Sequence, residues 1–523
     1  MGPYGKIDPR EEVTVRFKET LKPDISSFGY ATVLSISTTS IWGGVYPYLP
    51  DPCQTPRTTI LFYLVQMIFF LLTFCSGLTL TWKNTQWARK IHIAVFSIPL
   101  GAGPLMLIAA MYTEVAPLPL IIGAATLVGI GSAGYLMSWQ RVFAAMDSIA
   151  GTLALIKGTA ASALLYFCLC FIPAALTSYL IPLVLVPLAG LCLWLAAKQT
   201  DSAQPMFEDV PAEHRVVYRN ALKESIPVAL SIGAFGFCSG AIRFIAVTHQ
   251  ALLGMINIAS MAFLLFVTIA LFAIWRTRPF RLDLLSVFRL MFPIVGTCLM
   301  VLPFMGKGFT NAGFAVTYSC FQLACMLMMM HCGQISRDSG INPVFVYAFY
   351  AAIAYLLQTF GYVVGYISGS GDVLGVEQLS MVAIVCLYVM LLIALCGRRI
   401  KKLHTSRVEF LAFPINAATE SAPASSNRKH SSDSAEEQVA SDDKRGIEDI
   451  TALKCEKARQ IYALSDREKE VMELIVKGNT GPAIAEMLFI SENTVRTHSK
   501  RIYAKMGVHK KQELLNMVDN ISL

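Results

Sequence analysis

The feature that most constrains this chain is a series of apolar runs, each about 20 residues long, between Ser27 and Cys396. A helical run of that length crosses the ~30 Å hydrocarbon core of a bilayer. Of all residues, 55% are hydrophobic and 15% are charged, whereas soluble domains carry about a quarter charged residues. These values exclude a soluble enzyme with one large core and also a disordered chain. We therefore expect an all-α membrane protein.

Hydropathy predicts twelve spans within residues 27–396, preceded by an N-terminal arm over residues 1–26. The longest connection, Ala197 to Glu224, divides the spans into six plus six. The expected spans lie near 27–49, 58–81, 91–112, 117–139, 149–172, 176–197, 225–247, 252–275, 286–305, 311–335, 342–367 and 378–396.

Lys and Arg are distributed unequally between the two sets of loops. The arm and the loops after even-numbered spans hold nearly all of them, whereas the loops after odd-numbered spans contain only Arg57 and Lys307. Basic residues concentrate on the cytoplasmic side of a membrane. We therefore expect both termini to be cytoplasmic.

The six-plus-six layout resembles that of the major facilitator superfamily, whose two six-helix halves are pseudo-symmetric. In that superfamily the loop after the second span usually reads Gly-x-x-x-Asp-Arg-x-Gly-Arg-Arg, whereas residues 82–90 read Trp-Lys-Asn-Thr-Gln-Trp-Ala-Arg-Lys here. The twelve predicted spans also contain no Asp or Glu. Proton-coupled carriers generally need an ionisable relay in the membrane, although a uniporter does not. Both departures favour a sensor over a carrier.

Five polar side chains in the spans are candidate ligand-binding residues. Lys157 lies ~12 Å from the predicted inner edge, and it either faces a cavity or extends its stem to the interface. Arg243 lies close to the outer edge of its span, where extension to the interface is favoured. Gln66, Gln322 and Gln358 lie at mid-depth and either line a cavity or join helices by hydrogen bonds. A buried lysine in an acid-free bundle predicts an anionic or strongly polar ligand.

Residues 397–463 are predicted to form a cytoplasmic, flexible linker. From Ala417 to Asp443 the sequence is dominated by Ser, Ala, Glu and Asp, and such a stretch cannot bury enough apolar surface to fold alone. A coil of ~50 residues spans roughly 40 Å root-mean-square. That reach suits a domain that must meet a large partner, although a spacer without a mechanical role has the same composition.

Residues 464–523 predict a compact four-helix domain. Ser465 and Glu468 form a capping box for the first helix, which Gly478 ends. The second helix is expected from Pro482 to Leu488. The third begins after Ser491 and ends at Gly507, and the fourth runs from His509 to about Val518.

These residues resemble the LuxR-type (FixJ/NarL-like) helix-turn-helix domain. One departure lies in the second helix, where Gly481-Pro482-Ala483 replaces the family's usual Asn-Lys-Glu. The residues that match the family pattern at fixed spacing are Leu464, Ser465, Arg467, Glu468, Glu470, Val471, Gly478, Thr480, Ile484, Ala485, Leu488, Ile490, Ser491, Thr494, Val495, Arg496, His498, Ile502, Lys505, Gly507 and Val508.

Basic charge is concentrated on the third helix and its exit. Residues 464–523 hold nine Lys and Arg against eight Asp and Glu, but from Ser491 to Lys511 the only acidic residue is Glu492. Such a footprint favours binding to DNA phosphates, although a solvated protein-interaction face can also be basic. The resemblance implies that the third helix enters the major groove and that the fourth, through Leu514, Leu515 and Val518, pairs two copies on DNA.

By the same resemblance, eight residues are predicted to contact DNA, and His498 is expected to be a packing residue. The residues assigned to base edges are Arg496, Thr497 and Lys500, with Arg496 suited to bidentate contact with guanine. Those assigned to phosphates are Thr494, Arg501, Lys505, Lys510 and Lys511.

Together these features predict a one-component transcription regulator of the bacterial inner membrane, which senses a small ligand through its membrane domain and binds double-stranded operator DNA. The alternative is a major-facilitator-like transporter with a regulatory, DNA-binding tail, and a third interpretation is an interaction scaffold. No nucleophile–base array, metal-ligand cluster or phosphate loop is recognisable. We therefore predict no enzymatic activity, metal or cofactor.

Overall fold

The computed structural model divides the chain into two compact units. The membrane unit comprises Met1–Ser202, Phe207–Ser336 and Ile341–Phe410, and the C-terminal unit is made chiefly of Leu411–Leu523. The residues that the structure describes are 24–41, 55–83, 90, 92–110, 112, 118–200, 205–212, 215–248, 250–277, 280–301, 304, 307–368, 376–398, 407–410, 451–479, 484, 487–488, 492–508 and 511–521.

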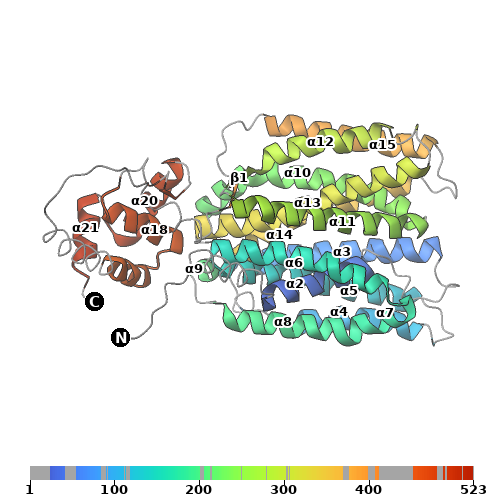
Figure 1. Cartoon of the computed structure of the whole chain (residues 1–523), viewed down its shortest axis with the longest axis horizontal. Coiled ribbons are helices and arrows are strands. Elements are labelled where there is room, and N and C mark those ends of the chain that lie inside the picture. The colour runs from blue at the N-terminus through green and yellow to red at the C-terminus, as the bar shows by residue number, and fades with distance from the viewer. Residues whose placement is uncertain are drawn as a thin grey trace, which may run out of the picture. The chain divides into compact units, whose positions relative to one another are not determined.

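The membrane unit is a bundle of long, roughly parallel helix axes (Figure 1). Its first half contains α2 (Ile25–Ile36, continued by a π-helical turn at Ser37–Ile41), α3 (Pro56–Trp82), α4 (Ile93–Ala110), α5 (Leu118–Ala145), α6 (Ser148–Cys170), and α7 (Ala174–Leu180), which continues through a π-helical turn into α8 (Val186–Gln199). After the short α9 (Pro205–Glu208), the second half contains α10 (Arg215–Thr248), α11 (Gln250–Thr277), α12 (Leu284–Val301), α13 (Lys307–Ser339), α14 (Pro343–Ser368) and α15 (Val376–Arg398).

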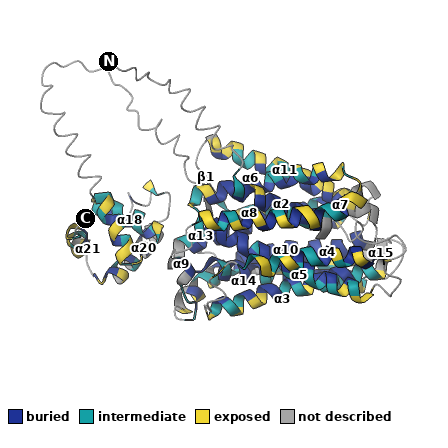
Figure 2. Ribbon diagram, turned by 90° about the horizontal axis from the view of Figure 1, so that it is seen from below, coloured by how far each residue is buried: buried dark blue, intermediate teal, exposed yellow. Residues whose placement is uncertain are grey.

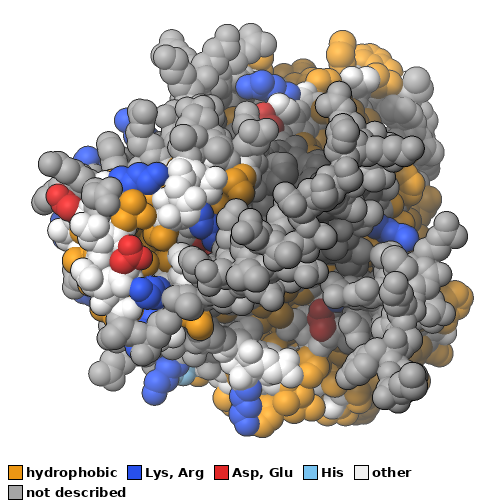
Figure 3. Space-filling view, turned by 60° about the vertical axis from the view of Figure 1, so that its left-hand side comes forward, with side chains coloured by type: hydrophobic (Ala, Val, Ile, Leu, Met, Phe, Trp, Pro, Cys, Tyr) orange, Lys and Arg blue, Asp and Glu red, His pale blue; other side chains and the backbone are white. Residues whose placement is uncertain are grey.

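Ten helices in the described part of the chain are long and apolar enough to cross a membrane. The first predicted span is helical over the shorter described stretch 25–41, and the last is helical as α15, whose apolar part at Ser380–Ile393 is shorter than the other spans. The count of twelve therefore remains a prediction. Large apolar side chains such as Ile98 and Phe266 are exposed on the bundle, and apolar residues cover much of its described rim (Figures 2 and 3). Lipid is the solvent that suits such a surface.

Helix packing follows the predicted division into halves. Within the halves, α2 packs on α6 and α10 packs on α14; between them, α3 packs on α14 and α6 packs on α11. In the order of the predicted spans, the contacts between halves join the second to the eleventh and the fifth to the eighth. Shifting every number by six exchanges these two contacts, as two pseudo-symmetric halves require.

Small residues allow α10 and α14 to approach closely. Gly236 and Gly240 on α10, and Gly361 and Gly365 on α14, each form a Gly-x-x-x-Gly pair. A Cβ atom at Gly240 would lie 2.0 Å from the backbone oxygen of Gln358, and one at Gly361 would lie 2.0 Å from that of Phe237. The hydrophobic effect does not drive helices together in a membrane, because lipid tails are as apolar as the helix surfaces. Close packing of this kind drives helix association there instead.

A short antiparallel ladder joins two connections of the second half. Strand β1 (Phe280–Asp283) precedes α12 and pairs with β2 (Arg407–Phe410), which follows α15. Strand β2 lies in the segment expected to be a flexible linker. That segment therefore contains a stretch that is tied to the membrane unit.

The C-terminal unit packs a helix over residues 451–461 together with α18 (Asp466–Val476), α20 (Glu492–Met506) and α21 (Lys511–Asp519). The 451–461 helix also lies in the predicted linker, yet its Cys455 and Ala458 are fully buried in the shared core. Of the predicted second helix, only Ile484, Met487 and Leu488 are described, and Ile484 is buried in the same core.

Predicted helix ends in this unit are confirmed at Ser465, Gly478 and Gly507, whereas the predicted starts of the second and fourth helices lie outside the described residues. The Ser465 hydroxyl accepts a hydrogen bond from the Glu468 amide, and the Glu468 carboxylate accepts one from the Ser465 amide, which completes the capping box. Gly478 and Gly507 have φ values of +90° and +68°, the left-handed conformation that ends a helix without a steric cost at glycine. The helix over residues 451–461 ends instead at Ala463, with φ +49°.

We expect Gly240→Leu to destabilise the membrane unit by about 1–3 kcal/mol or more, because its side chain has no room against the α14 backbone. Gly254→Leu is the matched control, since nothing lies within 4 Å of the Cβ position there. Thermal unfolding of the purified protein in detergent measures both variants. Equal melting temperatures for the two variants would contradict the close packing of α10 on α14.

Candidate nucleic-acid interface and membrane cavity

Helix α20 presents one face to the core of the C-terminal unit. Val495, His498, Ile502 and Met506 are buried at helical spacing. Positions 496, 497 and 500 therefore lie on the other side of the helix. The side chains of Thr494, Arg496, Thr497 and Lys500, and the whole of Lys510, lie outside the described residues.

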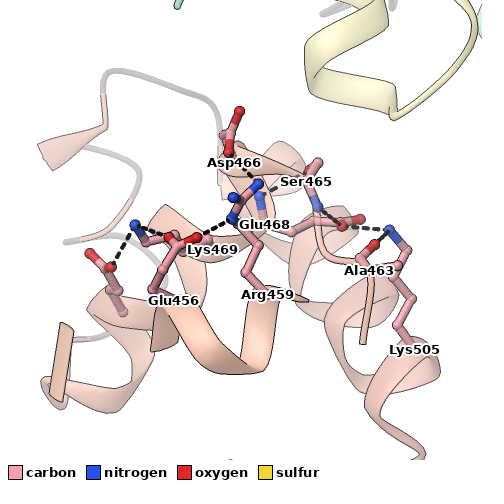
Figure 4. A network of polar contacts seen from close by, with 9 residues as sticks. Glu456, Arg459, Ala463, Ser465, Asp466, Glu468, Lys469 and Lys505 are labelled. Atoms are coloured by element: carbon pink, nitrogen blue, oxygen red, sulfur yellow. Dashed lines mark hydrogen bonds and ion pairs between the residues drawn. The ribbon is translucent and has the colours of Figure 1, made fainter. Parts of the chain in front are cut away.

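Among the other predicted phosphate contacts, Arg501 is half-buried and Lys511 is exposed, with its amino group 3.5 Å from the backbone oxygen of Asn479. Lys505 forms its contacts with residues of its own domain (Figure 4). Its amino group lies 2.7 Å from the Glu468 carboxylate and 2.9 Å from the backbone oxygen of Ala463. The structure thus gives Lys505 a role in holding α20, which the family pattern alone did not indicate.

Glu468 is the buried centre of this contact, with 3% of its surface exposed. The same carboxylate oxygen accepts hydrogen bonds from the Ser465 amide, at 2.8 Å, and from Lys505. A buried carboxylate is stable only when it is paired and hydrogen-bonded. Glu468 therefore fastens the start of α18 to the last turn of α20.

Ion pairs fasten the 451–461 helix to α18 (Figure 4). Arg459 bridges Glu456, at 2.8 Å, and Asp466, at 3.1 Å, and Lys469 lies 2.7 Å from Glu456. The hydrogen bond from Lys469 lowers the pKa of Glu456, against the opposing effect of partial burial. These contacts make the 451–461 helix part of the C-terminal domain.

Arg467 holds the described end of the predicted second helix, a role that the capping-box pattern did not reveal. Its guanidinium donates a hydrogen bond to the backbone oxygen of Leu488, at 2.7 Å, and forms an ion pair with Glu470. Leu488 ends the predicted second helix. Arg467 thus ties α18 to Leu488.

His498 is confirmed as a packing residue, with 1% of its surface exposed. Burial, together with the nearby charges of Arg501, Arg467 and Lys505, lowers the pKa of His498 to about 3. The imidazole is therefore neutral at physiological pH. Its neutral form suits the core position that the helical spacing gives it.

Helix α21 differs from the expectation that its apolar residues pair two copies. Leu514 and Val518 are fully buried in the core of their own domain, and Leu515 is half-buried. Two of the three residues assigned to the dimer are therefore used within one copy. The spacing of apolar residues did not distinguish an internal core face from an interface between copies.

In the membrane unit, a cavity of about 70 Å³ lies between the two halves. Gln322 lines it, as the sequence allowed, with aromatic residues from both halves. These include Tyr30 on α2, Tyr318 on α13, and Tyr347 and Tyr355 on α14. The wall is apolar apart from hydroxyl and amide groups, which suits a small ligand with a few polar atoms.

Gln66 and Gln358 meet where α3 packs on α14. Both are 1% exposed and line one narrow space, together with Met67, Phe70 and Tyr355. The Gln358 amide has no hydrogen-bond partner in the described part of the chain. These two glutamines therefore lie at the contact between the halves and not in the wall of the cavity that Gln322 lines.

Lys157 has a carboxylate partner, so the idea of an acid-free surrounding was wrong. Its amino group lies 2.9 Å from Asp24, which caps the start of α2. Asp24 precedes the first predicted span and was counted with the N-terminal arm. The ion pair joins α2 to α6 and removes the need for a ligand carboxylate at Lys157.

Arg243 does not extend to the interface, because it is only 2% exposed. Its guanidinium carbon lies 5.0 Å from the ring centre of Tyr63 and 5.4 Å from that of Tyr318. It also donates a hydrogen bond of 3.4 Å to the Tyr63 hydroxyl. Aromatic faces attract a cation and keep it buried. Tyr318 also lines the cavity, so Arg243 lies one side chain away from it.

Comparison with known proteins identifies the C-terminal domain. Residues 462–518 match the family of bacterial regulatory proteins named luxR. Over 59 residues the chain is 44% identical to a Pseudomonas aeruginosa protein named as a transcriptional regulator, and over 71 residues it is 38% identical to the response regulatory protein YgeK of Escherichia coli. These matches cover 11% and 13% of this chain, and 28% and 48% of the two relatives.

The membrane unit is similar to a solved structure of a bacterial homologue of the iron transporter ferroportin, in an outward-facing state. The identity is 15% and the TM-score 0.50, over 73% of this chain and 100% of that one. At this identity the likeness shows the fold alone. Residues 462–518 therefore form a LuxR-type helix-turn-helix domain, which this chain joins to a membrane unit with a major-facilitator-like fold.

Proposed function

We propose that this membrane-bound regulator senses a small ligand through its membrane unit and binds operator DNA through α20. The observation that carries the proposal is the presence, in one chain, of a LuxR-type domain and a carrier-like bundle. The ten apolar spans within the described helices contain no Asp or Glu. That composition favours sensing over proton-coupled transport.

The proposed ligand site is the cavity between the halves, at Gln322 and Tyr318. Ligand binding there changes the balance between two tilts of the halves only if the ligand binds one tilt more tightly. Arg243 contacts Tyr318, so a ligand that moves Tyr318 would also act on Arg243. Gln66 and Gln358 lie at the contact that such a tilt would change. In this proposal Lys157 joins α2 to α6 through its ion pair with Asp24 and does not bind the ligand.

On DNA, α20 is proposed to lie in the major groove, with Arg496, Thr497 and Lys500 at base edges. Thr494, Arg501, Lys510 and Lys511 are proposed to contact phosphates. Lys505 is also proposed to contact a phosphate, in addition to its bonds to Glu468 and Ala463. Two copies are proposed to bind an inverted repeat, through surfaces of α21 other than its buried face.

We expect Arg496→Ala and Lys505→Met to separate DNA reading from stability. Arg496→Ala should cost about 1–3 kcal/mol of specific DNA binding and relax the preference at one base pair, without changing the unfolding of a 451–521 fragment. Lys505→Met should lower the unfolding free energy by about 1–3 kcal/mol, because it leaves the buried Glu468 carboxylate without its cation. Gel-shift titration and urea unfolding measure the two effects. An unchanged stability of Lys505→Met would contradict the structural role given to Lys505.

The proposed orientation places both termini on the cytoplasmic side of a bacterial inner membrane. The C-terminal domain must reach DNA, and the basic loops favour that side. A reporter fused after Leu411 should behave as cytoplasmic, and one inserted at Gly371 should behave as external. Alkaline phosphatase and green fluorescent protein fusions measure this. The reverse pattern would contradict both the orientation and the function.

The function itself is tested by mapping the DNA that the full chain binds in cells and then measuring transcription of the neighbouring genes. We expect specific sites, and a response that is lost when residues 413–523 are deleted. Gln322→Leu should abolish the response to the inducing condition while leaving protein level and basal DNA binding intact. If no gene responds and the deleted chain still takes up a solute, the transporter interpretation replaces this one.

A further inference from the structure

A basic pocket lies at one end of the first half, away from the cavity between the halves. It has a volume of about 350 Å³ and is bounded by the start of α4 and the ends of α5 and α8. Its basic side chains are Lys90, Arg141 and Lys198. No acidic residue is among those that line it. Three cations around one space create a strongly positive potential.

Aromatic rings hold two of these cations in place. The Lys198 amino group lies 3.7 Å from the ring centre of Trp194, and the Arg141 guanidinium carbon lies 4.7 Å from that of Phe207. Arg141 is buried, with 7% of its surface exposed, whereas Lys90 and Lys198 are exposed. The pocket therefore has a buried cation, Arg141, at its base and two exposed cations, Lys90 and Lys198, at its mouth.

An apolar stripe runs from the middle of the bundle to the mouth of this pocket. Val184, Leu191, Trp194 and Lys198 follow one another at helical spacing, and all four are exposed. Helix α8 lies beside α4 at the edge of the bundle (Figure 1). The stripe thus offers an apolar track that leads directly to three cations.

We propose that this pocket binds an anionic phospholipid, with its phosphate among Lys90, Arg141 and Lys198 and an acyl chain along the Val184–Trp194 stripe. The pocket lies at the end of the bundle that carries the basic loops, where anionic headgroups attract Lys and Arg. A free phosphorylated solute would use the same cations but would leave the stripe unused. The stripe therefore favours the lipid.

The bound headgroup would join three helix ends to the connection between the two halves. Phe207 belongs to that connection and packs on Arg141. A lipid phosphate on Arg141 would add an interaction at this junction. The first half and the connection would then respond together to the anionic lipid content of the membrane.

The test uses the full-length protein in detergent, with phosphatidylglycerol or phosphatidylcholine as probe and native mass spectrometry as readout. Phosphatidylglycerol should bind in preference to phosphatidylcholine. The double variant Lys90→Gln/Lys198→Gln should weaken phosphatidylglycerol binding by about tenfold to thirtyfold. Lys83→Gln is the control, because Lys83 is exposed but is not among the residues that line the pocket.

Equal binding of the two lipids, or unchanged binding by the double variant, would overturn the proposal. Glycerol 3-phosphate and inorganic phosphate are tested as competitors at millimolar concentration. Displacement of the lipid by either would assign the pocket to a soluble phosphorylated compound and overturn the lipid assignment. Trp194→Ala should weaken phosphatidylglycerol binding, because Trp194 belongs to the stripe that would hold the acyl chain, and unchanged binding by this variant would contradict the use of the stripe. If the double variant does not fold, the comparison of the two lipids on the unmodified protein decides.

Discussion

The ion pair between the buried Glu468 carboxylate and Lys505 is the interaction on which the fold of the LuxR-type domain depends. One oxygen of the carboxylate meets the amide of Ser465 and the amino group of Lys505, and that amino group also reaches the backbone oxygen of Ala463. Three segments thus meet at one ion pair: the end of the 451–461 helix, the start of α18 and the last turn of α20. The orientation of α20 follows from this junction and from the core behind it.

The membrane unit handles its buried charges by a different rule. Lys157 is paired with a carboxylate at a helix start, and Arg243 lies between two tyrosine rings. A charge in hydrocarbon is costly, so each of these cations has partners from another helix. Both arrangements join helices that are far apart in sequence. The Lys157 pair joins α2 to α6 within the first half, whereas Arg243 joins α10 of the second half to α3 of the first.

Patterns within one segment were predictable from the sequence. The capping box at Ser465, the helix ends at Gly478 and Gly507, and the apolar spans all follow from residues close together in the chain. Contacts between distant segments were not predictable. The partner of Lys157 is 133 residues away, and no spacing rule connects Lys505 to Glu468. The predicted base contacts on α20 remain predictions.

The ladder between β1 and β2 determines which motions of the membrane helices can be transmitted along the chain beyond α15. Helix α15 ends at Arg398, and the chain next appears as a strand at Arg407–Phe410, paired to the connection before α12. A twist of α15 about its own axis therefore has no continuous helix along which to travel onward. Strand β2 moves together with the α11–α12 connection, because it is paired to β1 there. In the proposed function, a signal from this bundle would thus be passed on as a displacement of this ladder and not as a torque along a helix.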